Sequence, residues 1–260
     1  MNAYGGTNMT ERIDRVALVT GAAGGLGSQV AALFAQQGHD VALVDVKENG
    51  LQRVIGEIGE VPSKLIALPA DLVDVAQCEG VVADTIAQLG KVDILVNTAA
   101  IFERSELEDM TPEYFDRTFN INARAPFFLA RTAMADMAKR KWGRVVNITS
   151  VGVYRGGMRM TSAPYEASKG AISVFTKMYA NHGAPDGILV NTVCPGMMAT
   201  PMLLDGTTTQ AVLDEITQVT PLKRMAEAIE VARMIVWICG DENTYATGAT
   251  FDINGGWVMP

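Results

Sequence analysis

The stretch that decides the fold is Val16-Ala17-Leu18-Val19-Thr20-Gly21-Ala22-Ala23-Gly24-Gly25-Leu26-Gly27. It begins with an apolar run typical of a buried strand, and the apolar residues 30–35 that follow the glycines are typical of a helix. Glycines between a strand and a helix let backbone N–H groups approach a pyrophosphate, which the positive end of the helix also attracts. A flexible turn is the alternative for a lone glycine cluster. In its strand–helix context, the stretch predicts a dinucleotide-binding site.

The next predicted strand bears on the choice of cofactor. It covers residues 41–45 and ends in Asp45, 18 residues beyond Gly27. A carboxylate at this place accepts hydrogen bonds from a ribose 2′-OH and repels a 2′-phosphate. Lys47 lies nearby and would offset part of that repulsion, but the glycine loop has no Lys or Arg. Asp45 therefore favours NAD over NADP, the alternative being a solvated residue at a strand end.

Strand-like and helix-like segments alternate along the chain, which predicts a seven-stranded parallel sheet with helices on both faces, a doubly wound α/β (Rossmann) fold. A loose tail is expected over residues 1–10, and one dinucleotide-binding domain over residues 11–260. The irregular residues 195–221 follow the carboxyl end of a strand and are a candidate substrate lid. The expected strands are 16–20, 41–45, 65–68, 94–97, 144–149, 189–193 and 250–253, and the main expected helices are 75–89, 112–139, 163–180 and 226–239.

Composition narrows the classes of function. The 260 residues carry a net charge of −8, which argues against a nucleic-acid surface because such surfaces are basic. No apolar run approaches the length of a membrane span. Cys78, Cys194 and Cys239 are isolated, so their spacing predicts neither a metal site nor a disulfide framework. A reducing, cytoplasmic location is the expectation.

Tyr165 and Lys169 are the strongest catalytic candidates. They lie four residues apart at the start of a predicted helix and therefore share one face. A phenol with a pKa of about 10 is a poor acid or base at neutral pH, and an adjacent ammonium group favours its ionised form. On spacing alone, an ordinary surface helix would explain the pair equally well. The other motifs of the chain favour an acid/base catalyst.

These motifs resemble the short-chain dehydrogenase/reductase family in its compact single-domain form, over about residues 15–257. No single motif is decisive, whereas their order and spacing together are specific. They are the segment from Thr20 to Gly27, Asp71-Leu72, Asn97-Thr98-Ala99-Ala100, Asn122, Ser150, Tyr165 with Lys169, Pro195-Gly196 with Thr200, Thr247-Gly248, and the segment from Asp252 to Trp257.

The resemblance implies four catalytic residues. Tyr165 would exchange a proton with the substrate oxygen, and Lys169 would lower the pKa of the tyrosine and hold the nicotinamide ribose. Ser150 would hydrogen-bond the substrate oxygen, and Asn122 would hold a water that links Lys169 to solvent. The residues alone leave other roles open: Ser150 could make a local turn bond, and composition does not choose between Asn120 and Asn122.

The resemblance also implies a set of cofactor-binding residues. Asp71 would contact the adenine end and Thr200 the nicotinamide amide, although each could instead cap a helix. Ala100 departs from the family, which usually has glycine there, and its methyl group predicts a modest shift in cofactor binding. The full set is Gly21, Gly25, Leu26, Gly27, Asp45, Asp71, Leu72, Asn97, Ala99, Tyr165, Lys169, Pro195, Gly196 and Thr200.

The activity that the resemblance implies is hydride transfer between NAD(P), with NAD favoured, and a secondary alcohol or ketone. The alternative is a non-catalytic, dinucleotide-sensing regulator on the same fold, which would be expected to lack Tyr165 or Lys169; this chain has both. By the same analogy the protein would be a homotetramer, with the apolar tail from Trp257 to Pro260 packed across a subunit interface.

Residues that flank the predicted site suggest what its pocket accepts. Flexible thioethers and an aromatic ring suit an apolar or aromatic small molecule, although some of these side chains could simply pack the lid on the core. Arg155 and Arg159 could bind a carboxylate, but solvent-exposed arginines are the favoured interpretation. The candidate pocket residues are Tyr154, Met158, Met160, Met197, Met198 and Met202.

Overall fold

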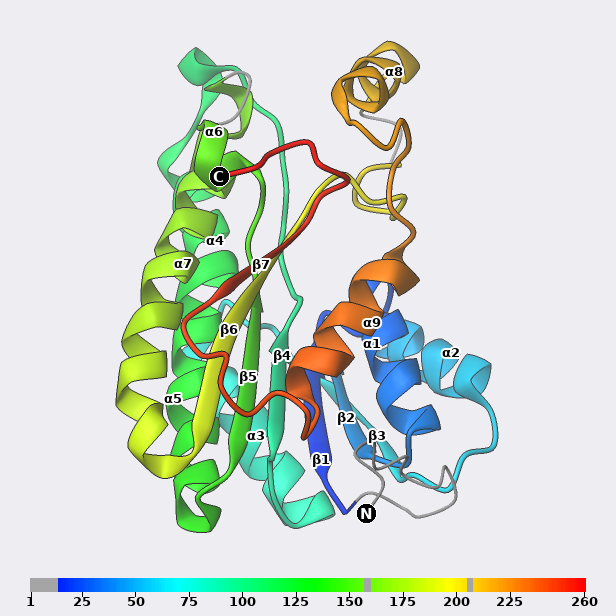
Figure 1. Cartoon of the computed structure of the whole chain (residues 1–260), viewed down its shortest axis with the longest axis vertical. Coiled ribbons are helices and arrows are strands. Elements are labelled where there is room, and N and C mark those ends of the chain that lie inside the picture. Colours follow the sequence, from blue (N-terminus) through cyan, green and yellow to red (C-terminus); the bar gives the residue numbers. More distant parts are fainter. Residues whose placement is uncertain (1–13, 157–159, 205–207) are drawn as a thin grey trace, which may run out of the picture.

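The computed structural model of the chain describes residues 14–156, 160–204 and 208–260. The predicted tail over residues 1–10 lies outside these residues, as do Met158 and Arg159. Seven parallel strands form one sheet in the order β3-β2-β1-β4-β5-β6-β7 (Figure 1). All seven predicted strands are confirmed, with ends within two residues of the prediction. They are β1 (Val16–Thr20), β2 (Asp40–Asp45), β3 (Leu65–Pro69), β4 (Ile94–Asn97), β5 (Gly143–Ile148), β6 (Ile188–Pro195) and β7 (Thr250–Ile253).

The strand order reverses between β1 and β4, which lie side by side in the sheet although β2 and β3 intervene in sequence. At their carboxyl ends Thr20 is the register partner of Asn97. The chain segments that leave these two strands therefore begin next to each other. In a doubly wound sheet this reversal is the place where ligands bind.

Helices cover both faces of the sheet (Figure 1). One layer contains α1 (Gly25–Gln36), α2 (Glu48–Ile58) and α9 (Ala228–Cys239), and the other contains α3 (Val75–Leu89), α5 (Ala125–Met137) and α7 (Ala163–Gly183). The remaining elements are short. They are α4 (Pro112–Phe119), α6 (Gly152–Arg155), α8 (Gln210–Val219), the π turn η2 (Asn120–Arg124), and the 3₁₀ turns η1 (Leu107–Asp109), η3 (Ala138–Arg140), η4 (Met160–Ser162) and η5 (Ala184–Asp186).

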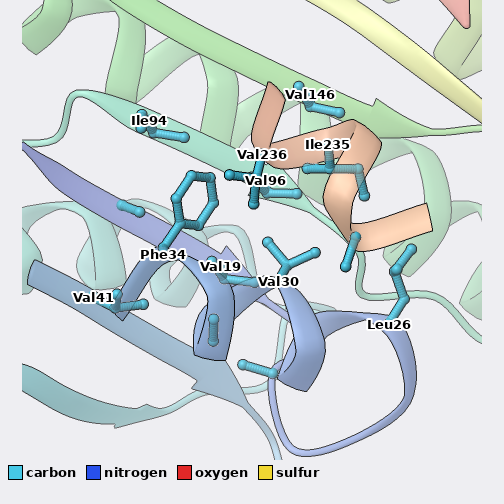
Figure 2. Packing of buried hydrophobic residues seen from close by; sticks show 14 of the residues in the cluster. Val19, Leu26, Val30, Phe34, Val41, Ile94, Val96, Val146, Ile235 and Val236 are labelled. Atoms are coloured by element: carbon cyan, nitrogen blue, oxygen red, sulfur yellow. The ribbon is translucent and has the colours of Figure 1, made fainter. Parts of the chain in front are cut away.

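Each layer has its own apolar core because strand side chains alternate between the two faces. In β1, Val19 belongs to the core beneath α1 and α9, whereas Leu18 belongs to the core beneath α3 and α5. Figure 2 shows Phe34 and Val30 of α1 between the strands and Ile235 of α9. Burial of these side chains fixes α1, and with it the glycine loop at its N-terminus.

The helical stretch predicted over residues 112–139 is helical throughout, but a π turn interrupts its α-helical pairing. The structure divides it into α4 and α5, separated by the π turn η2 that contains Asn122. The Asn122 side chain bonds the chain that follows β4: its Oδ1 accepts from Ile101 N and its Nδ2 donates to Ile101 O, both at 2.9 Å. Side-chain bonding of this kind competes with regular helical pairing, and π turns often occur at functional sites.

The stretch expected to be irregular over residues 195–221 contains a helix, α8. Its Leu213 and Ile216 lie three residues apart and are buried, so a short apolar stripe fixes a segment whose composition suggests a loop. Within the described ranges, no helix has both the length and the apolar character needed to cross a bilayer.

Candidate functional site

The glycine loop between β1 and α1 lies against the end of β4. Gly21 has a φ of +67°, and a Cβ there would lie 2.8 Å from the Ala99 Cα. A Cβ at Gly27 would lie 2.3 Å from the Gly21 carbonyl oxygen and 2.6 Å from Thr98 Oγ1. Thr98 Oγ1 in turn donates to the Thr20 carbonyl. Close packing thus excludes a side chain at Gly21 and at Gly27.

Asp45 closes one end of this loop. Its Oδ2 accepts from Ala23 N at 3.2 Å and its Oδ1 accepts from Lys47 N at 3.0 Å. These bonds hold the carboxylate in one orientation at the end of β2. Asp71 does not cap α3: its Oδ1 accepts from Val73 N at 3.0 Å, and Asp74 is the residue that caps the helix.

A cavity of about 1300 Å³ extends along the carboxyl edge of the sheet. Asn97, Asn122 and Tyr154 are not in its wall. The Asn97 amide lies within the sheet and donates to Asn147 Oδ1 at 2.8 Å. The predicted residues that line the cavity are Gly21, Gly25, Leu26, Gly27, Asp45, Asp71, Leu72, Ala99, Ser150, Tyr165, Lys169, Pro195, Gly196, Thr200, Met197, Met198 and Met202.

The structure brings Tyr165, Lys169 and Ser150 together in the wall of this cavity. Tyr165 and Lys169 lie on the first turns of α7, and Ser150 lies two residues beyond the end of β5. Lys169 is only 3% exposed, and its Nζ donates to the Ile148 carbonyl at 2.9 Å and lies 5.6 Å from the centre of the Tyr165 ring. Phe102 packs edge-on against the same ring, with 4.9 Å between centroids.

The electrostatics of the pair differ from the sequence expectation. Burial raises the pKa of Tyr165, the neighbouring Glu166 and Cys194 raise it further, and hydrogen bonding with Ser150 lowers it. The net shift of the Tyr165 pKa is therefore upward, with burial as its largest cause, whereas the sequence predicts a lowering by Lys169. Burial lowers the pKa of Lys169 to about 8, against the opposing charge of Glu166.

The predicted pocket residues are only partly assembled. Tyr154 is 39% exposed, and its hydroxyl donates to Asp252 Oδ2 at 3.3 Å instead of facing the cavity, so its placement in the pocket is corrected. Burial and the charge of Asp252 raise its pKa to about 12. Met160 begins η4, whereas Met158 lies outside the described residues.

Sequence reasoning missed several residues of the cavity wall, among them Phe102, Glu166 and Trp257. Trp257 lies in the wall of its own subunit's cavity, and the Arg155 guanidinium carbon lies 5.3 Å from the centre of its ring. Glu166 adjoins Tyr165 in sequence, and this adjacency is the signal that could have placed it in the cavity wall. Phe102 and Trp257 approach the site only through the fold.

The fold and the cavity first define a class, that of doubly wound α/β proteins with a ligand-sized cavity at the sheet reversal. The sequence profile of the family described as enoyl-(acyl carrier protein) reductase matches residues 21–258. A short-chain dehydrogenase/reductase structure from Brucella melitensis, titled glucose/ribitol dehydrogenase, superposes with a TM-score of 0.87 at 30% identity, covering 96% of this chain and 99% of that one. The chain belongs to the short-chain dehydrogenase/reductase family of oxidoreductases, whose members use nicotinamide dinucleotides.

Curated relatives of the same length have varied names. The oxidoreductase UcpA of Salmonella typhimurium is 33% identical over 254 residues, with 95% of each chain covered. The 3-oxoacyl-[acyl-carrier-protein] reductase FabG of Thermotoga maritima is 34% identical, covering 94% of this chain and 98% of that one. The cyclopentanol dehydrogenase of Comamonas sp. is also 34% identical, covering 94% and 97%. The relatives thus include both dehydrogenases and reductases.

Proposed function

We propose that the protein is an NAD-dependent oxidoreductase that interconverts a secondary alcohol and a ketone on a mainly apolar small molecule. The observation that carries this proposal is the position of the Tyr165 and Ser150 side chains in the same cavity wall as the glycine loop. A dinucleotide bound along that loop would bring its nicotinamide toward these two hydroxyls.

The cavity fits a dinucleotide. Backbone N–H groups of the loop can approach a pyrophosphate at its glycines, which carry no side chain, and the N-terminus of α1 adds a partial positive charge. Residues that would hold the adenosine end are Asp45, Asp71 and Leu72, and those near the nicotinamide would be Pro195, Gly196 and Thr200. The bound nicotinamide would supply the hydride.

The protein's own residues would supply the proton and fix the substrate. In the reducing direction, the Tyr165 hydroxyl would donate its proton to the carbonyl oxygen as negative charge develops there. Ser150 would donate a second hydrogen bond to the same oxygen, and Lys169, held by the Ile148 carbonyl, would anchor the nicotinamide ribose. In the oxidising direction the Tyr165 phenolate would accept the proton.

NAD is the preferred cofactor in this proposal because Asp45 is fixed by two backbone N–H groups beside the loop. A carboxylate in that position accepts bonds from a ribose 2′-OH and repels a 2′-phosphate. Lys47 and Arg53, which donates to the Ala23 carbonyl at 2.7 Å, also line the cavity and are the competing positive charges. Asp45→Ala should raise the ratio of NADP to NAD efficiency by about tenfold or more, the factor that ~1.4 kcal/mol supplies.

The substrate class follows from the remaining cavity wall. Met197, Met198 and Met202 come from the segment after β6, and Phe102 and Ile121 also line the cavity. Adaptable thioethers and an aromatic ring suit an apolar or aromatic carbon skeleton. The segment from residue 195 to α8 would act as a lid over this substrate.

A non-catalytic sensor on the same fold is the second candidate, and turnover separates the two. The test is to supply a panel of ketones and secondary alcohols with each of the two cofactors. Turnover is monitored in both directions by the absorbance of reduced nicotinamide, and Tyr165→Phe is the control. We expect turnover with NAD or NADH that the variant loses. Dinucleotide binding without turnover of any member of the panel would favour the sensor.

The proposal includes a homotetramer in the cytoplasm. Exposed apolar side chains on α4 and α7, among them Phe115, Val174 and Met178, are compatible with helices that pack against other copies. Light scattering at micromolar concentration should give about four times the chain mass of 27.8 kDa. A monomeric mass would contradict the assembly and leave the chemistry untouched.

A further inference from the structure

One arginine in the cavity wall has no acceptor for its guanidinium group. Three arginines line the cavity, namely Arg53, Arg104 and Arg155. Arg53 donates to the Ala23 carbonyl at 2.7 Å, and Arg104 donates to Thr208 Oγ1 at 2.9 Å. Arg155 is exposed, and it forms neither a hydrogen bond nor an ion pair within the described part of the chain. Its charge is therefore available to a molecule in the cavity.

The guanidinium of Arg155 is nevertheless held in place by an aromatic ring. Its carbon lies 5.3 Å from the centre of the Trp257 ring, which also lines the cavity. A guanidinium over an aromatic face keeps its N–H groups free to bind an acceptor at its edge. Trp257 Nε1 is itself buried and has no acceptor among the described residues. The contact thus joins two side chains that donate hydrogen bonds and accept none.

Two acidic side chains that pack against α6 are engaged elsewhere. Arg155 ends this helix, and the preceding Tyr154 donates to Asp252 Oδ2 at 3.3 Å. The Glu166 carboxyl occupies the space beside Gly152 at the start of the helix, where it would clash with an added Cβ. Across the described ranges, neither acid forms an ion pair with Arg155. Because arginine pairs readily with carboxylates, their separation from Arg155 keeps a cation available to a carboxylate of a ligand.

Arg155 lies on the substrate side of the cavity, because its helix begins beside Ser150. Val153 N donates to the Ser150 carbonyl at 3.0 Å and Gly156 N donates to the Gly152 carbonyl at 2.7 Å, so the chain turns helically between Ser150 and Arg155. At a helical rise of about 1.5 Å per residue, Arg155 lies about 7 Å along this turn from Ser150. An anion bound at Arg155 would therefore lie several atoms away from the oxygen that Ser150 contacts.

We propose that Arg155, positioned by Trp257, binds a carboxylate at the far end of the substrate, so that the protein acts on keto acids and the corresponding hydroxy acids. The inference rests on the proposed function and narrows its substrate class to an apolar skeleton that carries a carboxylate. The N–H groups of a guanidinium match the two oxygens of a carboxylate. A carboxylate suits this wall better than a phosphate, because Glu166 and Glu215 also line the cavity and would repel a second negative charge.

The test compares keto acids with their uncharged esters. The probes are 4-oxopentanoate, 5-oxohexanoate and 6-oxoheptanoate and the methyl ester of each. They are titrated by calorimetry into the protein alone and into the protein with oxidised NAD, which cannot reduce a ketone. We expect at least one acid to bind about tenfold or more tightly than its ester, as hydrogen bonds to a charged group allow. Arg155→Gln should bring the two affinities together by weakening the acid, and should leave the melting temperature nearly constant.

Three further variants make the result specific. Arg155→Lys keeps the charge but loses the planar fork, and should retain only part of the preference for the acid. Trp257→Leu keeps Arg155 and removes the ring that positions it, and should lower the ratio of acid to ester affinity. Arg104→Gln is the matched control, because it removes a cavity arginine whose guanidinium already bonds Thr208, and should leave this ratio unchanged.

Equal affinities of acid and ester for the unaltered protein, no binding of any acid, or a preference for the acid that persists in Arg155→Gln would each overturn the inference. Calorimetry needs no turnover, so the result is decisive whether or not hydride transfer occurs. A preference that depends on Arg155, without reduction of any bound keto acid by NADH or NADPH, would count against the proposed function alone. Reduction of uncharged ketones without a preference for acids would overturn this inference alone.

Discussion

The amino ends and the carboxyl ends of the strands, the amino edge and the carboxyl edge of the sheet, differ in how completely their buried charged side chains are paired. At the amino edge, where the N-terminal label lies in Figure 1, buried Asp93 accepts hydrogen bonds from Val16 N at 3.0 Å and from Arg140 Nε at 3.2 Å. Asp136 likewise accepts from Val92 N at 3.1 Å and from Arg140 Nη2 at 2.9 Å. At the carboxyl edge, Lys169 has one protein acceptor and Glu166 Oε2 has no partner among the described residues.

The difference indicates that the paired charges of the amino edge stabilise the fold, whereas the incompletely paired charges of the carboxyl edge belong to the candidate site. Although burial alone would raise the pKa of Asp136, its bonds to Arg140 and Val92 hold that pKa below the ordinary value. The ionised form is therefore the one the fold stabilises. At the carboxyl edge burial dominates instead, and it moves the pKa of Lys169 toward neutrality. Incompletely paired charges of this kind cost stability and are typical of functional sites.

The largest expected effect tests the carboxyl edge. Tyr165→Phe should lower kcat by about 10³-fold, within the ~10²–10⁴-fold that a general acid contributes. NAD affinity and melting temperature should stay nearly constant, because the ring and its packing on Phe102 are retained. Steady-state kinetics and NAD titration measure both quantities. Tyr245→Phe, at a residue that is 97% exposed, is the matched control. A near-normal rate in Tyr165→Phe would show that another group moves the proton.

The second effect tests the amino edge. Asp93→Ala should lower the free energy of unfolding by about 3 kcal/mol, because it leaves the buried Val16 N–H and the Arg140 Nε–H without their acceptor. Asp186→Ala, which removes a surface partner of Lys141, should cost less than about 1 kcal/mol. Urea denaturation measures both. At a temperature where Asp93→Ala is fully folded, its kcat should equal that of the unaltered protein. A reduced kcat there would show that the amino edge affects the chemistry at the carboxyl edge.

The third effect is a pH dependence at the amino edge. Burial and the nearby Arg15 lower the pKa of His39 from 6.5 to about 4, against the charges of Asp93, Asp241 and Asp40. Between these values the unfolded chain binds a proton that the folded chain does not, so the contribution of His39 to stability is complete above pH 6.5 and is lost as the pH falls to about 4. We expect this contribution to be about 2 kcal/mol.

His39→Gln should remove this part of the pH dependence, whereas His182→Gln, at the exposed second histidine, should not. Denaturation at a series of pH values compares the two variants with the unaltered protein. Equal slopes in all three proteins would show that other groups control the acid limb.

The smallest expected effect is a gain in stability at the carboxyl edge, opposite in sign to the loss expected for Asp93→Ala. Lys169→Met removes a buried ammonium and should raise the free energy of unfolding by about 1 kcal/mol, since an apolar side chain avoids its desolvation. Turnover and NAD affinity should both fall. A loss of stability comparable to that of Asp93→Ala would show that the two edges are alike, and the comparison would fail.

Much of the fold could be predicted because apolar runs and glycine turns are local signals. Strand β1, the helix over residues 75–89 and the parallel pairing of the sheet follow from such patterns. The π turn at Asn122 could not be predicted, since it depends on bonds to Ile101, which is distant in sequence. Helix α8 could not be predicted either, because the composition of residues 195–221 is typical of a loop.

The candidate site divides in the same way. The pairing of Tyr165 with Lys169 follows from helical spacing, and most of the predicted cofactor residues line one cavity. The direction of the Tyr165 pKa shift could not be predicted from spacing, because burial, its largest cause, depends on the tertiary structure. Tyr154 lies in sequence between Gly152 and Arg155, which line the cavity, but its hydroxyl bonds Asp252 on β7.

The sequence by itself determined which segments become strands and helices, and where the glycine loop and the acid/base pair stand along them, because periodicity and glycine chemistry act over a few residues. Only the tertiary structure decided which side chains meet at the carboxyl edge and how far each is removed from water. Burial and long-range charge depend on residues that are distant in the chain, and these effects decide the protonation of Tyr165, Glu166 and Lys169.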